Sequence, residues 1–223
     1  MPLLGRAAIA MWWDITPAVR AEFEDWHSHE HLPERLGIPG FLRGSRWASA
    51  DGPEGFFVLY ELDAYAVLTS SAYVARLNDP TPWSTRMMPH HRNMVRSQCR
   101  IIESFGGGVA GLVLTLRLSP KPGEGEALRA HLLSLLASLP TRPGITGAHL
   151  LQTQTPELTA TREQQIRGSD AVADWIVLVS GYDPSVLKPL ATVELGAEML
   201  ASAMPMRITG LYALSHALTS TDR

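Results

Sequence analysis

Apolar and polar residues alternate with a period of two along several short stretches, which predicts strands. Residues 7–15 show it most clearly, because the large apolar side chains share one face, namely Ile9, Met11, Trp13 and Ile15. The other face carries Ala8, Ala10, Trp12 and Asp14. Further strands are predicted over residues 41–48, 56–62 and 98–105, and in the second half over residues 111–118, 146–154, 175–181 and 208–218.

Helices are predicted between these strands. Thr16-Pro17 is typical of a helix start, so we expect a helix from there to about His31. Pro33 lacks the N–H that would bond to the carbonyl of His29, and the helix should bend or stop there. Other helices are expected over residues 64–77, 124–139 and 184–200, with irregular or short helical structure over residues 81–95.

The two halves of the chain repeat one order of elements, βαββαβ. The turn Arg142-Pro143-Gly144-Ile145 repeats Ile38-Pro39-Gly40-Phe41 at an offset of 104 residues. We interpret this as an internal duplication, with one unit over residues 1–107 and a second over 108–223 that contains a polar insertion at 155–173. Each unit should be a ferredoxin-like α+β unit, a four-stranded antiparallel sheet with two helices on one face. Packing the two sheets together would cover their other faces and form an intramolecular α+β barrel with a cavity between the sheets.

Composition and charge narrow the class of protein. The chain has 223 residues and a formal net charge of −3, so neither nucleic acid nor an anionic membrane is an expected partner. No apolar run reaches the roughly 20 residues of a membrane helix, and the start does not resemble a secretory signal, which favours a soluble cytoplasmic protein. The single cysteine, Cys99, excludes an internal disulfide and a thiolate metal cluster.

Candidate chemistry is concentrated in residues 26–47. At 100° per residue, Glu30 falls on the apolar stripe of the first helix, His27 and His31 flank that stripe, and His29 points away. A carboxylate on an apolar stripe is costly unless it is paired or neutral. Glu30 either pairs with an arginine of the next strand, Arg43 or Arg46, or caps local backbone, or it has a raised pKa and works with His27 or His31 as an acid and base.

A metal site is a further alternative for the same stretch. His27, Glu30 and His31 match H-x-x-E-H, a zinc hydrolase signature, and Glu61 or Glu103 could supply a third ligand. The surroundings fit this poorly because Pro33 follows at once, so we expect no metal. Haem has no clear axial ligand, although the sequence leaves four histidines open for that role: His27, His31, His90 and His131.

Residues on three other segments could bind a substrate. Arg46 and Trp47 point to opposite faces of their strand, so one of them must face the barrel interior. Trp12 and Asp14 share the small-residue face of the first strand, where alanines would leave room for a ligand. Beyond the second helix, a polar and aromatic group could cover the cleft, namely Trp83, His90, His91 and Arg92.

The second half lacks the chemistry of the first. His131 is the positional match of His27, but Ser134 replaces Glu30 and Leu135 replaces His31. Any reaction should therefore take place in the first unit, and the second unit should serve as a wall and partner sheet.

A resemblance to a known family rests on the motif W-H-x-x-E-H-L-P at residues 26–33, the motif I-P-G-F at 38–41 and the strand with arginine and aromatic residues at 43–47. On these motifs the chain resembles the dimeric α+β barrel superfamily, and within it the EthD-like proteins. The superfamily includes cofactor-independent monooxygenases, isomerases, decarboxylases and haem peroxidases, so the fold alone says little about the reaction. The resemblance implies a ligand place in the cleft between the sheet and the helix end.

We therefore expect an EthD-like enzyme without a tightly bound cofactor that acts on a small apolar or aromatic metabolite. His27, Glu30 and His31 would move protons, and Arg46 would hold an anionic oxygen. The remaining candidate substrate-binding residues are Trp12, Asp14, Trp47, Trp83 and His90. The alternatives are a barrel that binds a small ligand or is structural without catalysis, and the zinc hydrolase. The expected partner is a small molecule, and besides the internal pseudo-dimer a further homodimer stays open.

Overall fold

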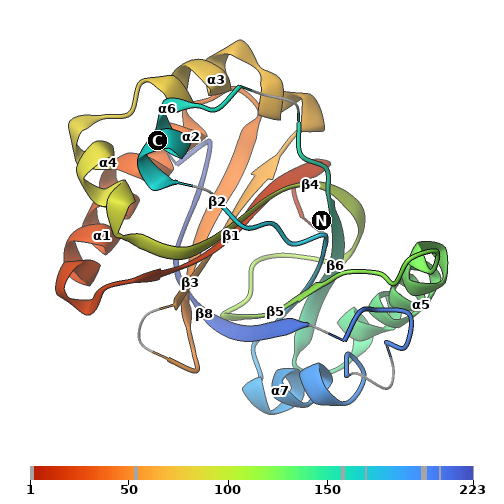
Figure 1. Ribbon diagram of the computed structural model, residues 1–223. Helices are drawn as coiled ribbons and strands as arrows, with labels where there is room; N and C mark the ends of the chain where they lie inside the picture. Colours follow the sequence, from red (N-terminus) through yellow and green to blue (C-terminus); the bar gives the residue numbers. More distant parts are fainter. Residues whose placement is uncertain are drawn as a thin grey trace.

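The computed structural model describes residues 3–52, 55–156, 159–168, 170–196, 200–205 and 207–222. Within these residues the strands form one closed barrel (Figure 1). The strands are β1 (Ala7–Ile15), β2 (Phe41–Ser49), β3 (Gly55–Leu62), β4 (His91–Gly106), β5 (Leu112–Leu118), β6 (Ile145–Thr153), β7 (Trp175–Gly181) and β8 (Ile208–Thr219).

The barrel has the order β1-β3-β2-β8-β5-β7-β6-β4. Its first four strands run β4-β1-β3-β2 and its last four run β8-β5-β7-β6, so both halves have the strand order of a ferredoxin-like unit. Antiparallel pairing of β2 with β8 and of β4 with β6 joins the two sheets at both edges. The predicted α+β barrel of two ferredoxin-like units is confirmed, while the boundary between residues 107 and 108 stays a prediction.

Helices cover the outer faces of the two sheets (Figure 1). In the first half they are η1 (Pro17–Val19), α1 (Arg20–Trp26), η2 (His27–His31), α2 (Leu32–Leu36), η3 (Tyr65–Thr69), α3 (Ser71–Asn78), α4 (Pro82–Met87) and η4 (Met88–His90). In the second half they are α5 (Gly125–Ser138), η5 (Leu139–Thr141), α6 (Arg162–Arg167) and α7 (Pro184–Thr192). The helix predicted over residues 64–77 is broken at Ser70, whose extended backbone caps α3. The helix predicted over residues 184–200 ends earlier, at Thr192, because residues 193–196 form turns, and residues 197–199 lie outside the described residues.

Successive side chains of β1 point to opposite faces of the sheet and belong to two different hydrophobic cores. Ile9, Met11 and Trp13 pack outward against the helices of the first half, whereas Ala8 and Trp12 face the barrel interior. Inside the barrel, large side chains from both halves fill most of the space, including Trp12, Trp47, Phe57, Ile176 and Leu178. The interior is therefore largely a packed core, which is usual for a barrel of eight strands.

Two equivalent turns support the duplication in the structure. Gly40 and Gly144 both have positive φ angles, +91° and +88°. A β carbon at Gly40 would collide with Val67, and one at Gly144 would press on Val186. Both turns thus need glycine for its backbone conformation and for close packing against the following helical segment.

The polar insertion of the second half lies over the first half. Helix α6 packs beside α3 and η4 (Figure 1). A capping box between Thr161 and Gln164 starts this helix. Beyond it, the Ala171 amide donates to the Met94 carbonyl at 3.0 Å, which ties the insertion to β4. In the described part of the chain, no helix is both long and apolar enough to cross a membrane.

Candidate functional site

The first predicted helix does not stop at Pro33, because a π-helical turn intervenes. In η2 the amide of Leu32 donates to the carbonyl of His27, five residues back. The added residue in this turn places Pro33 in the first turn of α2, where its missing N–H removes no helix bond. The turn also breaks the 100° spacing assumed from the sequence, so His27 and His31 are both buried and Glu30 is only half-buried.

Three histidines gather between the first sheet and its helices. The ring centre of His27 lies 5.6 Å from that of His31, and both rings pack among aromatic side chains. His91, at the start of β4, brings a third ring to within 5.0 Å of Trp13. These side chains line a cavity of about 30 Å³ together with Trp26 and Arg167. His90, the predicted residue, is half-buried and lies outside this cavity lining.

Several polar atoms at this cavity lack partners. Both ring nitrogens of His27, Nδ1 of His31 and Nε1 of Trp13 are buried without a hydrogen bond to any described residue. An unsatisfied buried donor or acceptor costs about 1–3 kcal/mol, and native proteins contain few of them. The cluster therefore keeps hydrogen-bonding capacity that the folded protein itself does not use.

The surroundings keep these histidines neutral. Burial is the largest cause of the lowered pKa of His27, and the positive charge of Arg46 lowers it further. Burial and then Arg35 lower the pKa of His31 in the same way. Burial lowers the pKa of His91 to about 4. At neutral pH the His27 ring thus offers one donor nitrogen and one acceptor nitrogen, whereas Nδ1 of His91 donates to the Met88 carbonyl at 3.0 Å and leaves Nε2 as an acceptor.

Two arginines that face this region are already held by protein groups. Arg35 forms a buried ion pair with Glu163 of α6, which contributes to raising the pKa of its guanidinium. Arg46 donates from Nη1 to the Glu24 carbonyl at 2.9 Å and from Nε to the Ser215 hydroxyl at 3.1 Å. Arg46 therefore acts on His27 through its charge, and it does not line the cavity.

Glu30 has different partners from those expected from the sequence. Its Oε1 accepts hydrogen bonds from Trp26 Nε1 at 3.1 Å and from the hydroxyls of Thr81 and Ser84. Arg43 pairs instead with Glu61, at 2.6 and 2.8 Å. The carboxylate therefore fastens α4 to the first helix and orients Trp26, whose ring centre lies 4.5 Å from that of His31.

The other predicted binding residues lie in separate places. Trp12 and Trp47 are inside the barrel, on the opposite side of the sheet from the histidines. Asp14 accepts a hydrogen bond from Asn93 at the end of β1. Trp83 donates to Glu22 on the surface. The period of two explains this separation, since neighbouring residues of a strand face opposite sides of the sheet.

Residues at the cavity that were not selected from the sequence include Trp13, His91 and Arg167. Trp13 carries a signal, because it lies on the same face of β1 as the apolar residues under the helices. His91 was noted only as a member of a polar loop. Arg167 belongs to the insertion of the other half and contacts the site only through the tertiary fold, so it carries no local signal.

The ligands considered for zinc are apart in the structure. Glu61 is held by Arg43, and Glu103 accepts from the amide of Ser104. Within the described residues, no group of three histidine, cysteine, aspartate or glutamate side chains is arranged to hold a metal ion. The cavity at the three histidines is also far too small for a porphyrin, so its residues as arranged do not fit haem.

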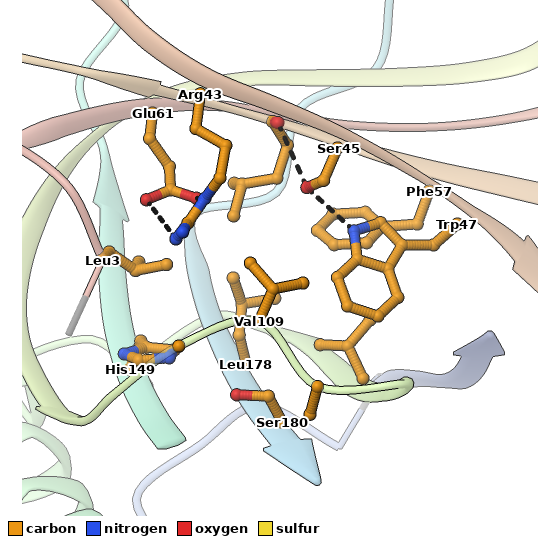
Figure 2. Close-up of a pocket in the computed structure, with 14 residues that line it drawn as sticks. Leu3, Arg43, Ser45, Trp47, Phe57, Glu61, Val109, His149, Leu178 and Ser180 are labelled. Carbon is orange, nitrogen blue, oxygen red and sulfur yellow. Dashed lines mark hydrogen bonds and ion pairs between the residues drawn. The ribbon is translucent and has the colours of Figure 1, made fainter. Parts of the chain in front are cut away.

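A second small cavity lies at one mouth of the barrel interior (Figure 2). The Arg43–Glu61 ion pair and the hydrogen bond from Trp47 to Ser45 lie on its walls. His149 faces them from β6, is 5% exposed and has its Nδ1 at 2.6 Å from the Ser104 hydroxyl. Burial, with a smaller effect of Arg43, lowers the pKa of His149 to about 4. The cavity between the sheets is thus reduced to a small space of about 30 Å³ here.

No protein-family model and no curated protein matches this chain. Solved structures share its fold at low sequence identity. An anthrone oxidase-like protein has 11% identity and a TM-score of 0.65, covering 96% of this chain and 93% of that one. A candidate monooxygenase from Fusobacterium nucleatum has 7% identity and a TM-score of 0.64, over 97% and 95% of the two chains. Another from Lactobacillus acidophilus has 11% identity and a TM-score of 0.57, over 97% of each chain.

These neighbours and the closed barrel define the class of fold. The chain has the dimeric α+β barrel fold, with both ferredoxin-like units in a single chain. The identities are too low to carry an activity from any neighbour to this chain.

Proposed function

We propose that the chain is an enzyme that works without a tightly bound cofactor and takes a proton from a small apolar or aromatic molecule at the three-histidine cavity. The observation that carries the proposal is His27, which is 1% exposed and has both ring nitrogens without a protein partner. A histidine kept only for packing would be expected to have at least one hydrogen bond.

The electrostatics suit the removal of a proton. A neutral imidazole can accept a proton from an acidic C–H or O–H group of a bound substrate. The substrate then becomes an anion, and the charge of Arg46 favours that anion, whereas Arg35 and Arg167 are already paired with Glu163 and Asp170. The new negative charge beside His27 also stabilises the imidazolium, which offsets the arginines that lower its pKa in the free protein.

The residues have distinct roles in this proposal. His27 is the proton acceptor, and His31 or His91 returns or relays the proton. Glu30 is a positioning residue, since it holds Trp26 against His31. Isomerisation and oxygenation pass through a substrate anion formed by loss of a proton, whereas decarboxylation forms its anion by loss of CO₂ and then needs a proton delivered, so the first two reactions fit the proposed step.

Two of the structural neighbours named above favour oxygenation among these reactions, through the words anthrone oxidase-like and monooxygenase in their descriptions. In an oxygenation, the substrate anion would be oxidised by dioxygen. A CH₂ group would become C=O, one oxygen atom would enter the product and the other would leave as water.

A substrate must displace part of the wall, because the cavity of about 30 Å³ is far smaller than ligand pockets of roughly 300–1,000 Å³. Helix α6 and its insertion form the wall that comes from the other half of the chain. The proposal therefore includes an outward movement of this insertion when substrate enters.

Anthrone is a suitable probe, since it is an aromatic molecule with an acidic CH₂ group. Oxygen uptake and quinone absorbance would be followed with the wild type, His27→Phe and His31→Phe. His29→Phe is the matched control, because His29 lies in the same turn with an exposed ring. We expect turnover by the wild type and the control, and a loss of about 10²-fold or more in the His27 variant. Equal rates in all four proteins would refute the assignment of His27.

A second candidate is a barrel that binds a small ligand without catalysis, since the unpartnered ring nitrogens of His27 could equally hydrogen-bond a ligand that does not react. In that case anthrone or a similar aromatic molecule would bind without turnover, and His27→Gln would change only the affinity. Elemental analysis of the purified protein separates both candidates from the zinc hydrolase, which requires a stoichiometric metal.

A further inference from the structure

A cavity of about 190 Å³ lies beside Arg117, away from the three histidines. Arg117 is on β5, two residues after Thr115, whose hydroxyl accepts a hydrogen bond from Trp12 inside the barrel. The guanidinium carbon of Arg117 lies 4.9 Å from the centre of the Trp12 ring. The arginine thus closes one end of the interior core and borders the cavity.

Arg117 forms no ion pair within the described residues. Burial lowers the pKa of its guanidinium, and the negative charge of Asp14 acts on it and partly opposes that lowering. The Nε of Arg117 is buried without a hydrogen-bond partner, and no described carboxylate lies within ion-pairing distance of its guanidinium. Asp14 accepts a hydrogen bond from Asn93, and Asp174, which lines the cavity, accepts one from Ser119, so both carboxylates keep their charge without contacting the guanidinium. The contact with Trp12 is a cation–π interaction, which leaves the N–H groups in the guanidinium plane free to donate.

The remaining walls of the cavity are mostly apolar. Val95 and Ala173 are on one side, and Val172 and Ile208 form the rim. Val172 is 51% exposed and Ile208 is 47% exposed, which is unusual for large aliphatic side chains. An unpaired guanidinium next to an apolar hollow with an apolar rim matches a molecule with an anionic head and an apolar body.

We propose that this cavity is a second binding site, for a small carboxylic acid with an apolar body whose carboxylate pairs with Arg117. The fork of the guanidinium can bind both oxygens of a carboxylate. The site lies on a different part of the molecule from the histidines, so it does not depend on the proposed reaction.

Binding of phenylacetate, hexanoate and the neutral phenylacetamide to the intact chain tests this site by calorimetry. We expect both acids to bind and the amide to bind at least tenfold more weakly, because it lacks the charge that Arg117 recognises. Arg117→Met should weaken phenylacetate at least tenfold while keeping aliphatic contact with Trp12. Arg129→Met, at an exposed position of α5, is the control and should bind like the wild type.

Asp174→Asn provides a test in the opposite direction. Asp174 lines the same cavity, so removing its charge should tighten phenylacetate binding. The NMR signal of the Arg117 Nε–H should shift on titration with the acid and stay in place with the amide. The proposal is overturned if the acids do not bind, if acid and amide bind equally, or if a folded Arg117→Met variant binds like the wild type. If that variant does not fold, the comparison of acid with amide and the Asp174→Asn variant decide the question.

Discussion

Replacement of His27 by phenylalanine distinguishes two hypotheses: that the imidazole ring only packs in the core, or that it serves a function. Each buried polar atom without a partner costs about 1–3 kcal/mol, and His27 has two such nitrogens. Phenylalanine removes both and would join Phe23, Trp13 and Trp26 in the aromatic cluster. Its larger ring can use part of the adjacent cavity, although overpacking costs about 1–3 kcal/mol where the fit is poor.

The balance of these effects is a gain of about 1 kcal/mol in the free energy of unfolding, or roughly 2–4 °C in the midpoint of thermal unfolding for a chain of this size. Urea unfolding followed by circular dichroism at pH 7.5 measures it, with His29→Phe as the exposed control. The gain should grow at pH 5, since the wild-type ring has a lowered pKa and must stay neutral in the folded state.

A His27→Phe variant less stable than the wild type by about 1 kcal/mol or more would refute the reasoning. It would mean that the ring nitrogens have partners in the native protein and that the site is structural. Higher stability together with lost turnover would show the exchange of stability for activity that is common at functional sites.

Further predictions concern the rest of the fold. The pKa of His149 is about 4 in the folded protein and about 6.5 in the unfolded chain. Its contribution to stability is therefore complete above pH 6.5 and is lost as the pH falls toward 4. The wild type should lose stability to urea between pH 7.5 and pH 5, and His149→Asn should make that loss smaller by about 2 kcal/mol. Arg35→Met should cost about 3 kcal/mol in the same assay because the buried Glu163 carboxylate then keeps only the longer contact with Arg167, at 3.8 Å, and adding Glu163→Leu should recover much of that loss. Gly40→Ala should lower the free energy of unfolding by about 1–2 kcal/mol because of its positive φ, whereas Gly52→Ala, at an open position, should change it little.

The barrel could be predicted from the sequence because its determinants are local and repeated. The alternation of apolar and polar residues predicted the first and last residues of β1 and β7, and it predicted which side chains lie on each face of β1. The proline and glycine of each turn marked equivalent positions in the two halves, Gly40 and Gly144. One such unit leaves one face of its sheet open, so the pairing of two units also followed from the pattern.

The details of the candidate site depended on features without a periodic signal. A regular helical wheel placed Glu30 toward the sheet, but the π-helical turn rotates it to Thr81 and Ser84 on α4. The sequence showed the insertion only as a polar segment, yet its Glu163 is 3% exposed because Arg35 of the other half neutralises it. No spacing within the chain indicates a contact between residues so far apart in the sequence.

The duplication explains how one half could acquire a site without loss of the fold. Helix α5 of the second half is regular, and Leu128, Leu132 and Leu136 fill the space over its sheet. His131, the positional match of His27, is exposed there because the buried stripe of α5 does not include it. The apolar core under α5 supports one side of the barrel, so the first half can tolerate buried histidines that lack partners. Moving the chemistry to the second half would therefore require a change in the face that α5 buries as well as the histidines.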